Sequence, residues 1–198
     1  MDIATYYMTS LLCENSRALL ERAIEGGYNF ADCLVAPDGC TMINRCAENM
    51  ELLHTMDGGK DKFFYENMEI ALKADENGVQ LMKLQCQNHI LNPLKENYGI
   101  DISDKAIRAA VKEHNEICEL IMQLSQFRKE EKPRITGYEF AVFCLATYVC
   151  PKYLIKDKLK ATVKEVAKRE PDDKKYRARV AVVGSEIDDL SLIKLIED

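Results

Sequence analysis

The feature that most constrains the fold is a pattern that repeats along the first half of the chain. A short apolar run is followed by a polar turn and then by a segment with helical spacing, and this order of β and α units predicts a parallel sheet covered by helices. The expected strands are Ile3–Met8, Phe30–Ala36 and Lys62–Leu72, and the expected helices are Glu14–Ile24, Met42–Leu53 and Glu76–Leu91. We therefore predict an α/β domain, a flavodoxin-like half, over residues 1–99.

The character of the sequence changes after Ile100, and residues 100–170 are predicted to be all helical. Ser103 can cap a long helix, Thr136-Gly-Tyr-Glu139 has the form of a capping box, and Pro151 permits a further helix over Tyr153–Lys168. In the long helix, six residues at steps of three and four are expected to share one buried face. They are Ile107, Val111, His114, Cys118, Ile121 and Leu124.

The last part of the chain, residues 177–198, is predicted to form one further strand and helix. Arg179–Gly184 is a β-branched run typical of buried parallel strands, and Ile187–Ile196 has helical character. A parallel strand needs neighbours. Arg179–Gly184 therefore either joins the N-terminal sheet or opens a second α/β domain that the chain does not complete, and Val180–Val183 then pairs with another chain or leaves an exposed apolar edge.

Composition and charge exclude several classes of function. The formal net charge of -6 argues against a nucleic-acid partner, because phosphate binding needs a concentrated basic surface. The longest apolar stretches fall short of the roughly 20 residues that span a bilayer. The N-terminus has no export signal, so we expect a cytoplasmic protein without a membrane partner.

Two of the eight cysteines occupy equivalent places in the repeated pattern. Cys13 and Cys40 each follow an expected strand and stand at the start of a helix, where unpaired N–H groups favour a thiolate. The carboxyl ends of parallel strands share one edge of the sheet, so both thiolates are expected to approach one ligand there. Chance placement of small buried residues is the alternative interpretation.

The remaining cysteines carry weaker signals. Cys150 precedes a proline and is undecided. The other five fall within an expected strand or within expected helices, so core packing explains them better. They are Cys33, Cys46, Cys86, Cys118 and Cys144.

Several stretches resemble a known family when they are taken together. They are Met8–Arg17, Gly27–Asp32, Val35–Arg45, Asn97–Ser103, His114–Asn115, Phe127–Lys129, Pro133–Gly137 and Arg179–Ser185. In combination they are similar to subunits of the 2-hydroxyacyl-CoA dehydratase and benzoyl-CoA reductase family, over nearly the whole chain. Family members usually have residues before the first strand and a further α/β domain with a third cysteine, and many have Asp where this chain has Thr41.

The resemblance implies a subunit that carries a 4Fe-4S cluster, or in a related branch a double-cubane cluster, with Cys13 and Cys40 as its first two ligands. It implies an ATP-dependent iron-sulfur activator, a sister subunit or a homodimer, and an acyl-CoA substrate that receives one electron and loses water. Since the third ligand lies in the further domain, the chain alone is expected to hold no stable cluster.

Three hypotheses about the function remain open on the sequence. The first is a component of a dehydratase-type lyase that is inactive alone, or of a related reductase. The second is an isolated domain without metal. The third is a flavodoxin-like binding module, which the absence of a glycine-rich phosphate loop disfavours, because Gly26-Gly27 and Gly58-Gly59 look like helix stops.

Overall fold

The chain divides into two compact units, Met1–Ile102 and Ser103–Asp198, each with its own core. The computed structural model describes residues 3–56, 63–171, 174–184 and 187–198. No helix in these ranges combines the length and the apolar character that crossing a membrane requires.

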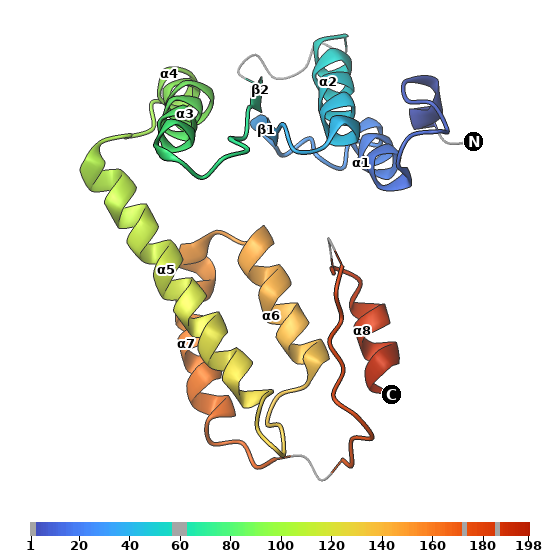
Figure 1. The fold of residues 1–198 in the computed structure, drawn as a ribbon, viewed down its shortest axis with the longest axis vertical. Helices are drawn as coiled ribbons and strands as arrows, with labels where there is room; N and C mark the ends of the chain where they lie inside the picture. Colours follow the sequence, from blue (N-terminus) through green and yellow to red (C-terminus); the bar gives the residue numbers. More distant parts are fainter. Residues whose placement is uncertain (1–2, 57–62, 172–173, 185–186) are drawn as a thin grey trace. The chain divides into compact units, whose positions relative to one another are not determined.

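The N-terminal unit is built around a small parallel sheet flanked by helices, which confirms the predicted α/β class (Figure 1). Strand β1 (Cys33–Pro37) pairs with β2 (Phe64–Met68) in a register that runs from Cys33 opposite Phe64 to Pro37 opposite Met68. The other elements are a 3-10 helix η1 (Ile3–Tyr6), α1 (Glu14–Ile24), α2 (Thr41–Met56), α3 (Glu76–Cys86), a π-helical turn η2 (Gln87–Leu91) and α4 (Asn92–Tyr98).

Local sequence explains how these helices begin and end. The Asp75 carboxylate accepts a hydrogen bond from the Gly78 N–H at 2.8 Å and caps α3. Gly99, at φ 67°, ends α4 in the left-handed conformation that favours glycine. Helix α2 connects β1 to β2 and packs on both strands, as a parallel crossover requires. The expected turn at Asp57–Gly59 lies outside the described residues.

The prediction of a strand over Ile3–Met8 is wrong. Residues Ile3–Tyr6 form η1, and the Met8 N–H donates to the Ala4 carbonyl at 2.8 Å. Ala4 and Met8 are fully buried against Leu20 of α1 and Cys46 of α2. The buried residues are thus spaced four apart, so a helical turn buries both, whereas a strand would alternate its faces.

The C-terminal unit consists of α5 (Asp104–Phe127), α6 (Gly137–Val149), α7 (Lys152–Val166) and α8 (Leu190–Glu197). Helices α5, α6 and α7 pack together around one core, and α8 packs on α6 (Figure 1). The predicted helical section is confirmed, including the capping box of Thr136 and Glu139 at the start of α6. The buried residues of the core are Ile117, Leu120, Leu124, Ile135, Leu159 and Val166.

Two expectations for this unit need correction. In α5 the buried face contains Ile117, Leu120 and Leu124, whereas Val111, His114 and Cys118 are not buried in it. The predicted face followed a strict repeat of seven, which drifts around a straight α-helix of 3.6 residues per turn.

The second correction concerns Arg179–Gly184, which is not a strand. Val180 is 64% exposed and Val183 is 90% exposed, and the segment pairs with no other strand of the described chain. The Arg179 guanidinium instead donates to the carbonyls of Lys129 and Glu130, at 3.0 and 2.6 Å. The apolar run therefore lies on the surface, because no neighbouring strand is available to pair with it.

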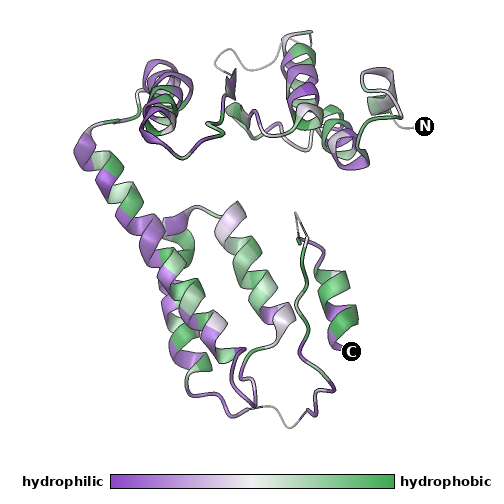
Figure 2. Ribbon diagram, viewed as in Figure 1, coloured by the Kyte–Doolittle hydropathy of each residue, from purple (hydrophilic) through white to green (hydrophobic). Residues whose placement is uncertain are grey.

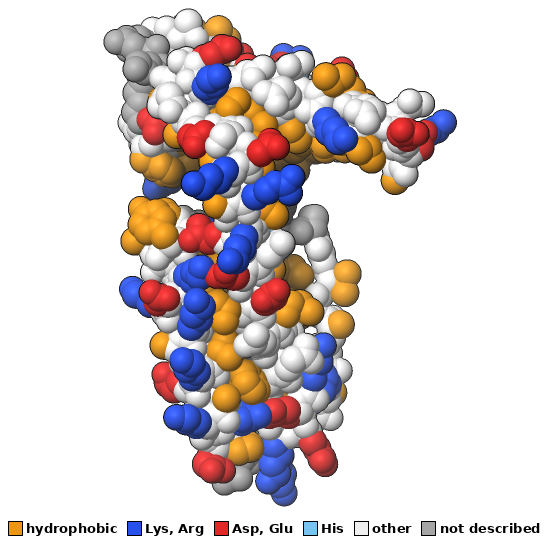
Figure 3. Space-filling view, turned by 90° about the vertical axis from the view of Figure 1, so that its left-hand side faces the viewer, with side chains coloured by type: hydrophobic (Ala, Val, Ile, Leu, Met, Phe, Trp, Pro, Cys, Tyr) orange, Lys and Arg blue, Asp and Glu red, His pale blue; other side chains and the backbone are white. Residues whose placement is uncertain are grey.

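Charge is mixed over the surface. The face in Figure 3 carries acidic and basic side chains next to one another, without a region of one sign. Lys156 of α7 pairs with Glu116 of α5, and its hydrogen bond lowers the pKa of the Glu116 carboxyl. Such pairs connect helices along the bundle, and they add little stability where solvent reaches them.

We predict that Leu124→Ala destabilises the C-terminal unit by about 2–5 kcal/mol, because Leu124 is fully buried and its removal leaves a cavity in the core. Met122→Ala on the same helix, where the side chain is 59% exposed, is the control and should cost under about 1 kcal/mol. Urea unfolding followed by circular dichroism measures both. Equal losses for the two variants would contradict this assignment of the core.

Candidate functional site

Cys40 lies at the carboxyl edge of the sheet, as predicted. The Asp38 N–H donates to the Met68 carbonyl at 2.8 Å and extends the pairing by one residue beyond β1, and the Gly39 N–H donates back to the Pro37 carbonyl. The chain then turns into α2, and the Cys40 carbonyl accepts the Asn44 N–H at 3.0 Å. The exposed Cys40 thiol therefore stands directly before the first turn of a helix that follows a strand.

A polar contact supports this turn from inside. The Asn44 side-chain amide donates to the Asp38 carboxylate at 2.7 Å and ties the first turn of α2 to the end of β1. Asn44 is only 9% exposed, and its carbonyl oxygen is buried without a hydrogen-bond partner among the described residues. A buried acceptor of this kind costs free energy unless a donor reaches it.

Cys13 opens α1, but no strand precedes it. It occupies the N-cap position with φ -51° and ψ 130°, and its carbonyl accepts the Arg17 N–H at 3.2 Å. The element before it is the η1 turn, so the predicted equivalence with Cys40 holds for the helix start and fails for the strand. Like Cys40, Cys13 is exposed.

A buried polar group also lies behind Cys13. Ser16 is 1% exposed, and its hydroxyl has no hydrogen-bond partner in the described part of the chain. Ser16 and Leu20 form the buried stripe of α1, and Cys13 precedes Ser16 by three residues and so begins the same stripe. In α2, Cys40 stands in a similar relation to the buried Asn44 and Ala47. Each exposed thiol thus begins the buried stripe of a helix, and α1 and α2 pack against one another.

The other cysteines divide by burial. Cys46 is 2% exposed, and burial raises the pKa of its thiol to about 11. Burial also raises the thiol pKa of Cys33, with a contribution from the Asp32 carboxylate, and of Cys144. These groups remain protonated at neutral pH and are poor metal ligands, which agrees with the predicted core role.

Cys118 is an exception to that prediction. It is exposed on α5, and its sulfur lies 3.4 Å from the His114 Nε2. The expectation that it packs in the core is wrong for the same reason as the predicted face of α5. Across the described ranges, no three His, Cys, Asp or Glu side chains gather closely enough to hold a metal ion.

Sequence reasoning missed a second polar site on the sheet. The His89 Nδ1 lies 2.6 Å from a carboxylate oxygen of Glu66, and both side chains are partly buried. His89 belongs to the π-helical turn η2 and Glu66 to β2, so the pair fastens that turn to the sheet. No local pattern relates residues 23 positions apart, and π-turns have no simple sequence signal.

Comparison with known proteins places this arrangement in a family. Residues 1–198 match the family model described as 2-hydroxyglutaryl-CoA dehydratase, D-component. The chain belongs to this family. Within the dehydratase D-component family, its sequence is 25% identical over 197 residues to a benzoyl-CoA reductase subunit of Thauera aromatica. That match covers 96% of this chain and 48% of the relative, so the chain spans about half the length of the relative.

We predict that iodoacetamide modifies Cys40 in the folded protein much faster than Cys46. With a pKa of about 11, the Cys46 thiol is ionised in only about one molecule in a thousand near pH 8, and burial blocks the reagent. Peptide mass spectrometry after timed quenching measures both rates, with urea-unfolded protein as the control in which the two cysteines react at similar rates. Equal rates in the folded protein would contradict the assigned burial.

We also predict that Cys13 and Cys40 lie close enough for a short bifunctional thiol reagent to join them within one molecule. The reason is that each opens one of two helices that pack together. Mass spectrometry of proteolytic fragments detects the cross-link, which Cys13→Ala should remove and Cys118→Ala should leave in place. Failure to cross-link, although each thiol reacts singly, would show that the two cysteines do not share a site.

Proposed function

We propose that this chain is the cluster-binding part of an iron-sulfur component of a 2-hydroxyacyl-CoA dehydratase-type enzyme, with Cys13 and Cys40 as two cluster ligands. The observation that carries the proposal is that two exposed cysteines open two packed helices in a chain matched throughout by this family. A helix start favours the thiolate, which is the form that binds iron.

The chemistry of the two cysteines fits half of a cluster site. An iron-sulfur cluster is held by about four cysteine thiolates, and the chain brings two exposed thiols to helix starts. The buried Ser16 hydroxyl behind Cys13 is a donor suited to a sulfur atom. The remaining ligands would come from another polypeptide segment, so we propose that the chain alone binds a cluster weakly or not at all.

When bound, the cluster would supply single electrons at low potential to a CoA thioester. The proposed part of this chain is to bind two irons through Cys13 and Cys40 and to shield one side of the cluster with α1 and α2. Under the dehydratase hypothesis, the substrate then loses water. Under the reductase hypothesis, which the similarity to a benzoyl-CoA reductase subunit favours, an aromatic thioester is reduced.

The proposed partners follow from the same interpretation. The matched family is named for one component of a dehydratase, and the relative is named as one subunit of a reductase, so both names describe parts of larger enzymes. We propose that this chain acts in the cytoplasm with a sister subunit or a second copy and with an ATP-dependent activator.

We further propose that residues 1–99 form the cluster-binding domain, residues 100–170 a helical section, and residues 177–198 the opening of a second α/β domain. The exposed valines of the 180–183 segment are the apolar surface that such a domain would cover.

Anaerobic reconstitution with iron and sulfide tests the proposal. The chain should take up a labile cluster, seen as broad visible absorption that a chelator removes, and Cys13→Ala and Cys40→Ala should each reduce bound iron and sulfide to background. Cys118→Ala, which removes another exposed thiol, is the matched control and should retain the uptake of the unchanged chain.

Two outcomes would contradict the ligand assignment. One is a stable cluster in a monomer that is indifferent to both substitutions, which would place the ligands among the other cysteines. The other is an unchanged chain that takes up no iron even with its sister subunit present, which would favour the metal-free domain.

A further inference from the structure

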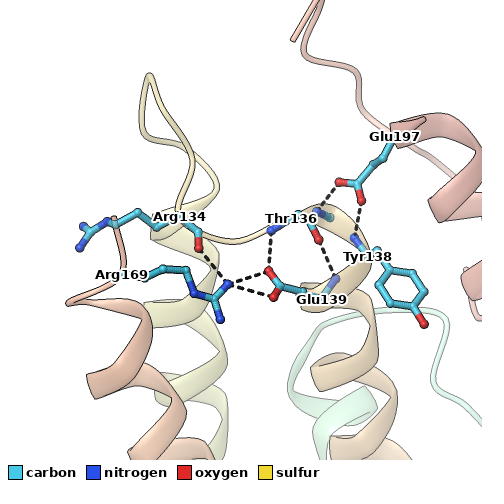
Figure 4. A network of polar contacts seen from close by, with 7 residues as sticks. Arg134, Thr136, Tyr138, Glu139, Arg169 and Glu197 are labelled. Carbon is cyan, nitrogen blue, oxygen red and sulfur yellow. Dashed lines mark hydrogen bonds and ion pairs between the residues drawn. The ribbon is translucent and has the colours of Figure 1, made fainter. Parts of the chain in front are cut away.

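The N-terminus of α6 has every one of its first N–H groups engaged (Figure 4). Thr136 and Glu139 form the capping box, with the Thr136 N–H on the Glu139 carboxylate and the Glu139 N–H on the Thr136 hydroxyl, both at 3.0 Å. The two N–H groups between them, of Gly137 and Tyr138, both donate to the carboxylate of Glu197.

Glu197 comes from the end of α8, 60 positions along the chain from Gly137. A helix N-terminus carries partial positive charge, so a carboxylate that accepts two N–H groups there forms a charge-assisted contact. Close approach requires glycine. A Cβ atom on Gly137 would lie 2.9 Å from the nearer Glu197 carboxylate oxygen and 3.9 Å from the Ile193 Cγ2.

Apolar packing contributes little to the docking of α8. Figure 2 shows hydrophobic colouring over most of this helix, yet Ile193 is its one fully buried residue among those described. Leu195 is 74% exposed, and Leu192 and Ile196 are nearly half exposed. The carboxylate is therefore the strongest contact that holds α8 against α6.

The segment before α8 is anchored at its other end. Arg179 binds the carbonyls of Lys129 and Glu130 in the connection between α5 and α6, and Lys174 donates to the backbone carbonyl of Glu197. The core of the C-terminal unit contains no residue of α8 in its buried cluster. The described residues from 179 onward thus lie over a bundle that has its own core.

We propose that α8 is a strap that the Glu197 carboxylate latches onto the N-terminus of α6, and that loss of this contact releases α8 while the α5–α7 bundle stays folded. The latch acts through charge, since it joins a carboxylate to a helix N-terminus. Its release frees both the apolar side of α8 and the α6 N-terminus to contact other surfaces.

Hydrogen–deuterium exchange with mass spectrometry on the full chain tests the latch. In Glu197→Ala, the amides of α8 and those of Gly137 and Tyr138 should exchange about tenfold faster or more, because a charged hydrogen-bond acceptor is lost. Amides in the middle of α5 should not change. Asp198→Asn removes a side-chain charge at the next position but leaves the Glu197 contacts with α6 in place, so α8 should stay protected as in the unchanged chain.

Gly137→Ala tests the geometry independently. Alanine raises helix propensity, so α6 itself should not weaken, while the added Cβ displaces the Glu197 carboxylate. Faster exchange in α8 with unchanged exchange in α5 is expected. Added salt should speed α8 exchange in the unchanged chain and not in Glu197→Ala, because screening weakens the contact only where it exists.

Two results would overturn the proposal. If α8 keeps its protection in both Glu197→Ala and Gly137→Ala, packing and not the carboxylate holds it. If α5 loses protection together with α8, the helix is an integral part of the bundle and not a strap.

Discussion

The parallel pairing of β1 with β2 is the constraint on which the N-terminal unit depends. Parallel strands cannot be joined by a tight turn, so the chain must cross over, and α2 is that crossover. The pairing continues through the Asp38 N–H to the Met68 carbonyl and so fixes where β1 ends and α2 begins. A slip of one residue would invert the faces of the strand and move Cys40 away from the first turn of α2.

Local signals predicted most elements because those elements depend on their own sequence. The capping box at Thr136 and the apolar runs around β1 and β2 needed no knowledge of the rest of the chain. The two wrong strands, Ile3–Met8 and Arg179–Gly184, share a cause: a strand exists only where another strand pairs with it. Ala4 and Met8 found partners in α1 and α2, and the 179–184 segment found none in the described chain.

The candidate site was predictable to the same extent. That Cys13 and Cys40 open helices follows from local punctuation, and both positions are as expected. The pair His89–Glu66 and the contact of Glu197 with α6 join residues far apart in the sequence, and only the folded chain brings them together. The exposure of Cys118 was missed because helical phase drifts along a helix as long as α5, so a pattern fitted at one end misplaces residues farther along.

Burial separates the cysteines by chemistry. Cys46 is held as a neutral thiol by the core that joins α1 to α2, while Cys13 and Cys40 meet solvent at the starts of those same helices. Under the proposed function, this division fixes the direction of assembly. The helices cover one side of a cluster, and two iron positions face outward, so the polypeptide that completes the ligand set must approach from the solvent side of the α1 and α2 N-termini. Its thiolates would remove the iron positions open to water, which is the physical reason for a component that functions only within a larger enzyme.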